Sequence, residues 1–325
     1  MKHPTILTFG NVVMDGLYRV KSLPGRDEKV FAESAAWSPG GPAVHFALTA
    51  AALGVSSAVL GWVGADSFGR QIEEALRKRG VSPLFERVPD ALTPTVVVTI
   101  DKTGEKAALL SPPIGKERLS VARLMLGVDF ALSSHLHTHL YHEEFVLRML
   151  EAAKRQEVST SLDVEPSSVE RWGIGAVRRA LSLVDIAFFN ERSVHMLATE
   201  PGGMEAKLRS ISAAGPSIAV CLSGAGGAYV YASGQLIHCP AIPVTVINSL
   251  GAGDIFSASF VCAILSGRTA ESAAAAATAA AAVSVSRSLD TVYYPTAEDV
   301  ERMMEKIPSF SFPRGEGRHG DLHER

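Results

Sequence analysis

Short apolar runs alternate with longer amphipathic stretches along most of this chain. Strands are predicted at Thr5–Phe9, Ala58–Val63, Phe130–Ser134, Thr160–Asp163, Ile186–Asn190 and Ile218–Leu222. Helices are predicted at Ala43–Leu53, Phe68–Arg79, Glu144–Gln156, Ile174–Leu183 and Gly253–Leu265. Because strands that alternate with helices form βα units, the pattern predicts a mainly parallel sheet covered by helices on both faces.

Two stretches interrupt this alternation. Leu17–Trp37 contains residues that favour extended backbone around Pro24–Asp27. Thr95–Leu110 predicts a hairpin, because a β-branched run is followed by a turn at Asp101–Gly104 and a return strand. Together they predict a small antiparallel sheet apart from the main one, and two separate surface hairpins are the alternative.

Thr269–Ser286 consists largely of alanine, the strongest helix former, and is bounded by polar residues. It predicts a buried helix whose small side chains let a backbone or a flat ligand approach closely. The segment 311–325 is rich in glycine, histidine and charged residues and has almost nothing to bury. We therefore expect this tail to be disordered.

Composition and patterning exclude several classes of protein. The formal net charge of -3 gives no electrostatic reason to expect a nucleic-acid partner. No apolar run is long enough to cross a bilayer, and the N-terminus has no apolar signal region. Cys221, Cys239 and Cys262 form no C-x-x-C spacing, which excludes a disulfide framework and disfavours a structural zinc site. We therefore expect a cytoplasmic protein with neither a membrane nor a nucleic-acid partner.

The segment Asn248–Asp254 stands directly before a predicted helix. Its glycines let the backbone turn tightly and direct successive N–H groups at one point. The helix N-terminus adds unpaired donors and the positive end of the helix dipole, so the segment suits an anion. Asp254 could accept the proton of a hydroxyl beside that anion, as phosphoryl transfer requires. The alternative is a structural glycine-rich loop whose aspartate is favoured by the dipole.

This segment resembles the second signature of the ribokinase-like (PfkB-type) carbohydrate kinases, usually written D-T-x-G-A-G-D. In that family the final aspartate is the catalytic base, and the resemblance gives this role to Asp254. The anion hole would consist of Gly251, Ala252 and Gly253. The implied activity is that of an ATP-dependent kinase that transfers the γ-phosphoryl group to a hydroxyl of a sugar or sugar derivative, a phosphotransferase with an alcohol acceptor.

Further elements of the family follow in its order along the chain. Gly10-Asn11-x-x-x-Asp15 resembles the N-terminal element whose aspartate binds sugar hydroxyls. Gly40-Gly41, followed by Leu53-Gly54, has the spacing of the first signature, whose glycine pair is a lid hinge. Val63-Gly64-x-Asp66-x-Phe68-Gly69 matches a further block. The substrate-binding residues implied by these matches are Asn11, Asp15, Gly40, Gly41 and His45.

On the nucleotide side, Ser223-Gly224-x-x-Gly227 resembles the family's glycine motif. Val285-Ser286-Arg287 closes a helix like the one beside the adenine, and its register places Thr278 near the base. The implied nucleotide-binding residues are Asn190, Ser223, Gly224, Gly227 and Thr278. The implied cofactors are ATP and Mg²⁺, which the nucleotide phosphates bring, and no residue is assigned as a direct metal ligand.

The resemblance implies a doubly wound, mainly parallel sheet with helices on both faces and a small β-sheet lid. The core would comprise residues 1–13, 38–91 and 113–310, and the lid residues 14–37 and 92–112. In relatives the lid closes over the sugar, which excludes water from the γ-phosphate, and often pairs two subunits. We therefore expect a sugar-like small-molecule substrate and a candidate homodimer interface on the lid.

Three positions depart from the family's pattern. His45 stands where the first signature carries a sugar-binding asparagine, so the contacts to sugar hydroxyls are expected to differ. Asn248 replaces the opening aspartate of the second signature, which removes a negative charge and puts a monovalent-cation site in question. Ser193 replaces the glutamate of the N-x-x-E element that begins at Asn190. Glu191 is adjacent, but at a strand end its side chain is expected to point differently.

Four histidines follow one another closely: His135, His137, His139 and His142. On a strand the alternate ones share a face, which suits either zinc or a substrate pocket at the strand end. Because no acidic or cysteine partner is evident nearby, we favour His137 and His139 as pocket lining, with solvent-facing histidines as the alternative. Together with His45 and Lys29 they would suit an acceptor that carries an acidic group, and an ordinary neutral sugar is the alternative.

Rival functions find less support. A dinucleotide-dependent oxidoreductase would need G-x-G-x-x-G after the first strand, and Gly10-Asn11-Val12-Val13 lacks it. No G-x-x-x-x-G-K-[ST] loop is present, which disfavours a P-loop enzyme. A nucleoside kinase of the same fold and a non-catalytic sugar- or nucleotide-binding relative stay open as alternatives, although the intact Gly251–Asp254 favours an enzyme. The acceptor sugar is not identified by these motifs.

Overall fold

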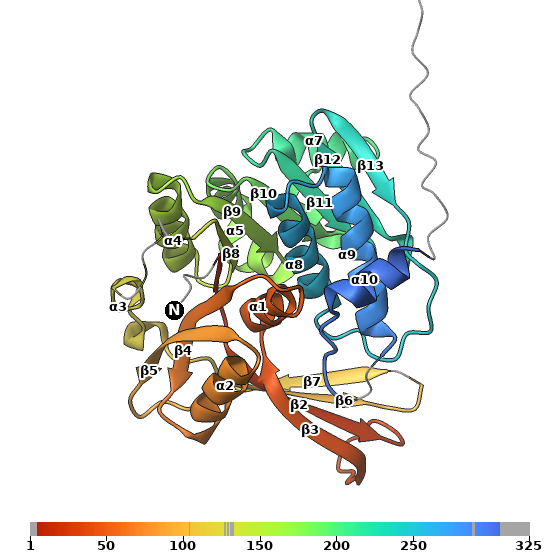
Figure 1. The fold of residues 1–325 in the computed structure, drawn as a ribbon. Coiled ribbons are helices and arrows are strands. Elements are labelled where there is room, and N and C mark those ends of the chain that lie inside the picture. The colour runs from red at the N-terminus through yellow and green to blue at the C-terminus, as the bar shows by residue number, and fades with distance from the viewer. Residues whose placement is uncertain are drawn as a thin grey trace, which may run out of the picture.

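The computed structural model describes residues 5–103, 105–126, 128, 130, 133–287 and 290–305. Its strands form a nine-stranded and a four-stranded sheet (Figure 1). The large sheet has the order β13-β12-β11-β10-β9-β8-β1-β4-β5. Neighbours from β11 to β5 pair in parallel, and β12 and β13 form an antiparallel edge. The bounds are β1 Ile6–Phe9, β4 Ser57–Gly64, β5 Val81–Val88, β8 His135–His139, β9 Ser159–Val164, β10 Ile186–Asn190, β11 Ile218–Leu222, β12 Ala228–Ala232 and β13 Gln235–Cys239.

Helices cover both faces of the large sheet (Figure 1). One face carries α1 (Pro42–Ala52), α2 (Ser67–Lys78), α8 (Ala252–Leu265) and α9 (Ala270–Val285), with α10 (Ala297–Met304) packed on α9. The opposite face carries α3 (Val121–Met125), α4 (Glu143–Arg155), α5 (Pro166–Leu181), α6 (Glu191–Leu197) and α7 (Met204–Ser212). This arrangement confirms the predicted doubly wound α/β fold.

Strand β10 shows why the central strands are continuous apolar runs. Phe188 packs with Phe260 of α8 on one face, while Phe189 packs with Val194 of α6 on the other. A parallel strand that is covered on both faces has no solvent side on which to place polar residues. The alanine-rich helix α9 is buried against α8, as predicted, because its small side chains allow the two helices to approach closely.

The four-stranded sheet lies apart from the large one, below it in Figure 1. Its order is β3-β2-β6-β7, with bounds β2 Val13–Val20, β3 Ala32–Gly40, β6 Thr95–Ile100 and β7 Lys106–Leu110. The predicted small sheet is therefore present, but it is mixed rather than antiparallel, because β2 and β6 pair in parallel. Lys106 Nζ reaches Ser249 Oγ of the core at 2.5 Å, and Arg19 pairs with Asp290 at 3.5 Å.

One predicted strand was wrong. Of Phe130–Ser134, the described residues 130, 133 and 134 lie outside any strand, and β8 begins at His135. The apolar run ends just before the strand, whose alternating histidines gave a polar pattern although every one of its residues is buried. The predicted helix at Ile174–Leu183 is the second half of α5, which starts at Pro166 and is interrupted at Gly173.

The sequence patterns missed β5, β12, β13 and the helices α3, α6, α7 and α10. The expected disordered tail at 311–325 lies outside the described residues. Among the residues that the structure describes, no helix is long and apolar enough to cross a membrane.

We expect the small sheet to become protected from hydrogen exchange when an acceptor sugar and a nucleotide bind together. Its hinge would be Gly40–Gly41, where Gly41 has a φ of 94°, and closure would shield the amides of β2, β3, β6 and β7. Hydrogen–deuterium exchange with mass spectrometry measures this directly. Protection confined to the large sheet would contradict the proposed lid.

Candidate active site

The N-terminus of α8 carries the Asn248–Asp254 segment. Gly251 has a φ of 70°, a left-handed conformation that glycine adopts without strain, and α8 begins at the next residue. The N–H groups of Ile247 and Asn248 donate to the carbonyl oxygen of Val285, which ties the segment to the end of α9. The first turn of α8 therefore has fixed unpaired N–H donors, a site suited to an anion.

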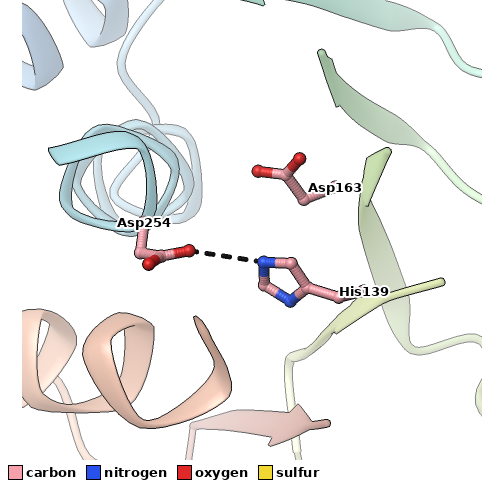
Figure 2. A group of neighbouring side chains, drawn as sticks. All are labelled: His139, Asp163 and Asp254. Carbon is pink, nitrogen blue, oxygen red and sulfur yellow. Dashed lines mark ion pairs between the residues drawn. The ribbon is translucent and has the colours of Figure 1, made fainter. Parts of the chain in front are cut away.

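Asp254 lies in that first turn, and His139 lies beside it at the end of β8 (Figure 2). His139 Nε2 is 3.3 Å from Asp254 Oδ1. Asp163 of β9 is the third member of the group, because it pairs with His139 in the register of the two parallel strands. One ligand atom from each of the three residues lies within 4.8 Å of the others.

The charges in this group shift the pKa of two of its members. Burial favours the neutral imidazole of His139, but its hydrogen bond to Asp254 and the charges of Asp163, Asp254 and Glu165 raise its pKa above the ordinary value. Burial raises the pKa of Asp163 to about 7, against the opposing effect of His139. The group therefore changes its protonation near neutral pH.

The acidic neighbours of His139 were missed by the sequence analysis. The expectation that no acidic partner stands near the histidines was wrong, because Asp163 and Asp254 both do. Asp163 lies one residue before the end of β9, the strand that follows β8 in the chain, and parallel neighbours end at the same sheet edge. That adjacency was the available signal for Asp163.

His135 and His137 are packed inside the core. Both rings reach Ser161 Oγ at 2.7 Å, and the His137 ring stacks on Phe46. Neither residue has accessible surface, and burial lowers the pKa of His135 to about 3 and that of His137 well below its ordinary value. His137 therefore supports the site from beneath and does not line it, contrary to the expectation. Among the described residues, the three alternate histidines do not form a metal-binding group.

The glycine pair and the N-terminal element meet on the acceptor side. A side chain at Gly40 would overlap the carboxylate of Asp15, and one at Gly41 would overlap the carbonyl oxygen of Asn11. Gly40 therefore lets the end of β3 lie against the Asp15 carboxylate, and Gly41 lets the chain pass close to the backbone of Asn11. Asp15 is buried on β2 and faces His45, which lies in the first turn of α1.

His45 is held between two polar groups. Its Nε2 is 3.4 Å from Asp15 Oδ2, and its Nδ1 is 2.9 Å from the hydroxyl of Tyr294. Because a carboxylate only accepts hydrogen bonds, a neutral His45 carries its proton on Nε2 and accepts from Tyr294 through Nδ1. The ring lies beside Gly251, so the acceptor side adjoins the N-terminus of α8. No sequence motif pointed to Tyr294.

A cavity of about 780 Å³ opens on the other side of α8. Its walls are mostly small or apolar, and they include four of the predicted nucleotide-binding residues together with two from the predicted anion hole: Asn190, Gly224, Gly227, Thr278, Ala252 and Gly253. Ala281, Ala282 and Val285 of α9 complete one wall. The alanine-rich helix thus provides the flat apolar surface that a planar base requires.

Ser223 and Glu191 stand at the edge of this cavity. The hydroxyl of Ser223 donates to the carboxylate of Glu191, so Glu191 faces the glycine motif from the start of α6. Asn190 caps α6, because its Oδ1 accepts from the Ser193 N–H at 2.9 Å. The Ser193 hydroxyl is buried and has no hydrogen-bond partner among the described residues. Glu191 therefore brings a carboxylate to the glycine motif, although residue 193 is a serine.

Comparisons with known proteins agree on one family. Residues 4–297 match the model of the pfkB family of carbohydrate kinases. A 5-dehydro-2-deoxygluconokinase of Bacillus subtilis (strain 168) is 25% identical over 297 residues, which cover 82% of this chain and 86% of the relative. A fructokinase of Klebsiella pneumoniae is 28% identical over 247 residues, which cover 71% of this chain and 77% of the relative. A ribokinase of Thermotoga maritima has a similar fold, with a TM-score of 0.75 at 22% identity over 93% of this chain and 99% of that chain.

Gly227→Ala tests the cavity. A side chain there would overlap the carbonyl oxygen of Cys239 and stand 2.6 Å from the N atom of Ala241, and Ala241 lines the cavity. We expect the KM for ATP to rise by about tenfold or more, because the loop must shift, while the KM for the sugar changes little.

Gly234→Ala is the matched control, because Gly234 also has a positive φ of 79° but an added Cβ there would meet only open space. It should lose only the stability that backbone strain costs, about 1–2 kcal/mol. Steady-state kinetics and thermal melts of both variants compare the two effects. An equal rise in the KM for ATP in both variants would contradict the assignment of the cavity.

Proposed function

The chain is a sugar kinase of the pfkB family of carbohydrate kinases, and we propose that Asp254 is the general base of its ATP-dependent phosphoryl transfer. One observation carries this proposal. Asp254 stands in the first turn of α8, whose Ala252 and Gly253 line the nucleotide cavity and whose Gly251 adjoins His45 on the acceptor side. A phosphate held at this terminus would lie between the two substrates.

The transfer then follows from the geometry. The acceptor hydroxyl oxygen attacks the γ-phosphorus while its proton passes to the Asp254 carboxylate. The bond between the γ-phosphorus and the bridging oxygen breaks, and ADP leaves with that electron pair. The N–H groups of the Gly251–Gly253 segment donate to the oxygens of the moving phosphoryl group, where negative charge is held during transfer.

ATP and Mg²⁺ are the cofactors of this proposal. Mg²⁺ prefers oxygen ligands and would neutralise charge at the nucleotide phosphates. Asn190 and Glu191 would hold it, since the first lines the cavity and the second faces the glycine motif. Asn248 would offer a monovalent cation no carboxylate, because its side chain is an uncharged amide whose Oδ1 accepts from the Leu250 N–H at 3.0 Å.

The acceptor is proposed to be a neutral sugar rather than an acidic one. Both imidazoles that could have attracted an acidic group already face carboxylates, His45 with Asp15 and His139 with Asp254. Asp163 adds a third carboxylate to the same neighbourhood. Lys29 is exposed on the connection between β2 and β3. An acidic acceptor would therefore meet more negative than positive partners.

We also propose the small sheet as the surface of a homodimer. Its edge strand β7 is exposed along its whole length and carries Leu109 and Leu110, and Phe31 before β3 is 97% exposed. Apolar side chains in such numbers on one small sheet favour contact with another protein surface.

Asp254→Asn is expected to lower kcat by about 10²–10⁴ while leaving ATP affinity almost unchanged, because an amide cannot accept the hydroxyl proton. A coupled ADP assay and titration calorimetry with ATP measure the two quantities. Asp90→Asn is the matched control, because Asp90 is an exposed residue with a φ of 53°, a conformation that asparagine tolerates. Wild-type kcat in Asp254→Asn would remove the proposed base.

A substrate panel tests the acceptor. We expect kcat/KM to be higher for neutral ketoses and aldoses than for sugar acids of the same size, because three carboxylates adjoin the acceptor side. His45→Asn removes the partner of Asp15 and Tyr294 and should raise the KM for the sugar without changing the KM for ATP. A wild-type preference for sugar acids would contradict the neutral acceptor.

A further inference from the structure

His139 directs one ring nitrogen at Asp254 and buries the other. Its Nε2 faces Asp254, and its Nδ1 is buried without a hydrogen-bond partner among the residues described. The residue as a whole is 8% exposed, so an acceptor hydroxyl cannot reach Nδ1 without a rearrangement of the strand ends. Its polar contact is with the base itself. The expected role of His139 as a substrate ligand therefore has no support in its contacts.

The contact with Asp254 fixes which oxygen of the base is available. A carboxylate only accepts hydrogen bonds, so a hydrogen bond from His139 to Asp254 needs the proton on Nε2, which lies 3.3 Å from Oδ1. The other oxygen, Oδ2, is then left for the hydroxyl proton. Since α8 positions the backbone of Asp254 and His139 positions its carboxylate, the side chain is held at two points (Figure 2).

The charge of His139 matters because the surroundings are acidic. Asp254 faces it from α8, Asp163 and Glu165 from the end of β9, and the neutral ring of His137 from its own strand. Two carboxylates so close together would repel the incoming γ-phosphate, which is itself anionic. An imidazolium between them offsets one negative charge at the point where the phosphoryl group must approach.

We propose that His139 is a positioning residue for phosphoryl transfer, which orients the Asp254 carboxylate through Nε2–H···Oδ1 and offsets the charge of Asp163. This inference rests on the proposed function of Asp254 as base. It assigns His139 a role that acts through Asp254, since Nε2 of His139 faces that carboxylate.

Two substitutions separate the hydrogen bond from the charge. His139→Gln places an amide N–H at a similar reach from the backbone, so it keeps the donor and loses the charge. His139→Leu loses both. We expect kcat of the leucine variant to fall by about ten- to a hundredfold, as for the loss of a hydrogen bond to a charged group, with little change in either KM. The glutamine variant should recover most of that loss at neutral pH.

The pH profile distinguishes positioning from a purely structural role. The pKa of His139 is raised in the folded protein, so its charge is present below that raised pKa and is lost as pH rises through it. Wild-type kcat should therefore decline on the alkaline side, while kcat of His139→Gln should stay level there.

His142→Gln is the matched control, because it removes a second buried imidazole from the same segment. His142 packs between Tyr141 and Phe145, and burial lowers its pKa to about 4. This variant should keep the wild-type kcat and pH profile, and thermal melts of all three variants confirm that they are folded.

The proposal is wrong if folded His139→Leu keeps the wild-type kcat. It is also wrong if the glutamine and leucine variants lose kcat by the same factor and both retain the wild-type pH profile. Loss of kcat in Asp254→Asn together with wild-type behaviour of His139→Leu would overturn this inference alone. Wild-type kcat in Asp254→Asn would overturn the proposed function instead.

Discussion

The N-terminus of α8 is the constraint on which the rest of the site depends. Gly251 turns the chain through a left-handed conformation, so that the unpaired N–H groups of the first helical turn and the carboxylate of Asp254 stand next to each other. Donors that attract an anion and a carboxylate that repels one are thereby held a few bonds apart. Such a pair suits an anionic group that arrives with a proton-bearing group beside it, which is the requirement of phosphoryl transfer to a hydroxyl.

The remaining elements hold this terminus between two different environments. On the nucleotide side the walls are small and apolar, from the alanines of α9 and the glycine motif after β11. On the acceptor side they are polar and acidic, with Asp15 tied to His45 and Asp163 set beside His139. The large sheet makes this possible, because its parallel strands β8 and β9 end side by side, with His139 opposite Asp163, next to the start of α8. The small sheet adds Lys106, which reaches Ser249 in the segment that leads into α8.

Much of this arrangement could be predicted from the sequence, because its parts are local. The turn at Gly251, the glycine pair at Gly40–Gly41 and the alanine-rich helix each need a special residue at a fixed place, and each was found. Asp163, Tyr294 and Glu191 were not assigned roles, since each acts through a residue that is distant in the chain and adjacent only in the fold. Strand β8 was misplaced for a related reason, because its buried histidines resemble a polar surface until Ser161 and Phe46 are known to cover them.

The central claim is that Asp254 and the N-terminus of α8 act together on one phosphoryl group. The most direct test is a crystal structure of the protein with ADP, Mg²⁺, an aluminium fluoride that mimics the moving phosphoryl group, and a sugar that it phosphorylates. The account predicts the fluoride group against the N–H groups of Gly251–Gly253, with the acceptor hydroxyl within hydrogen-bond reach, about 2.6–3.2 Å, of Asp254 Oδ2. A fluoride group bound away from α8, or a hydroxyl that faces another residue as its base, would contradict it.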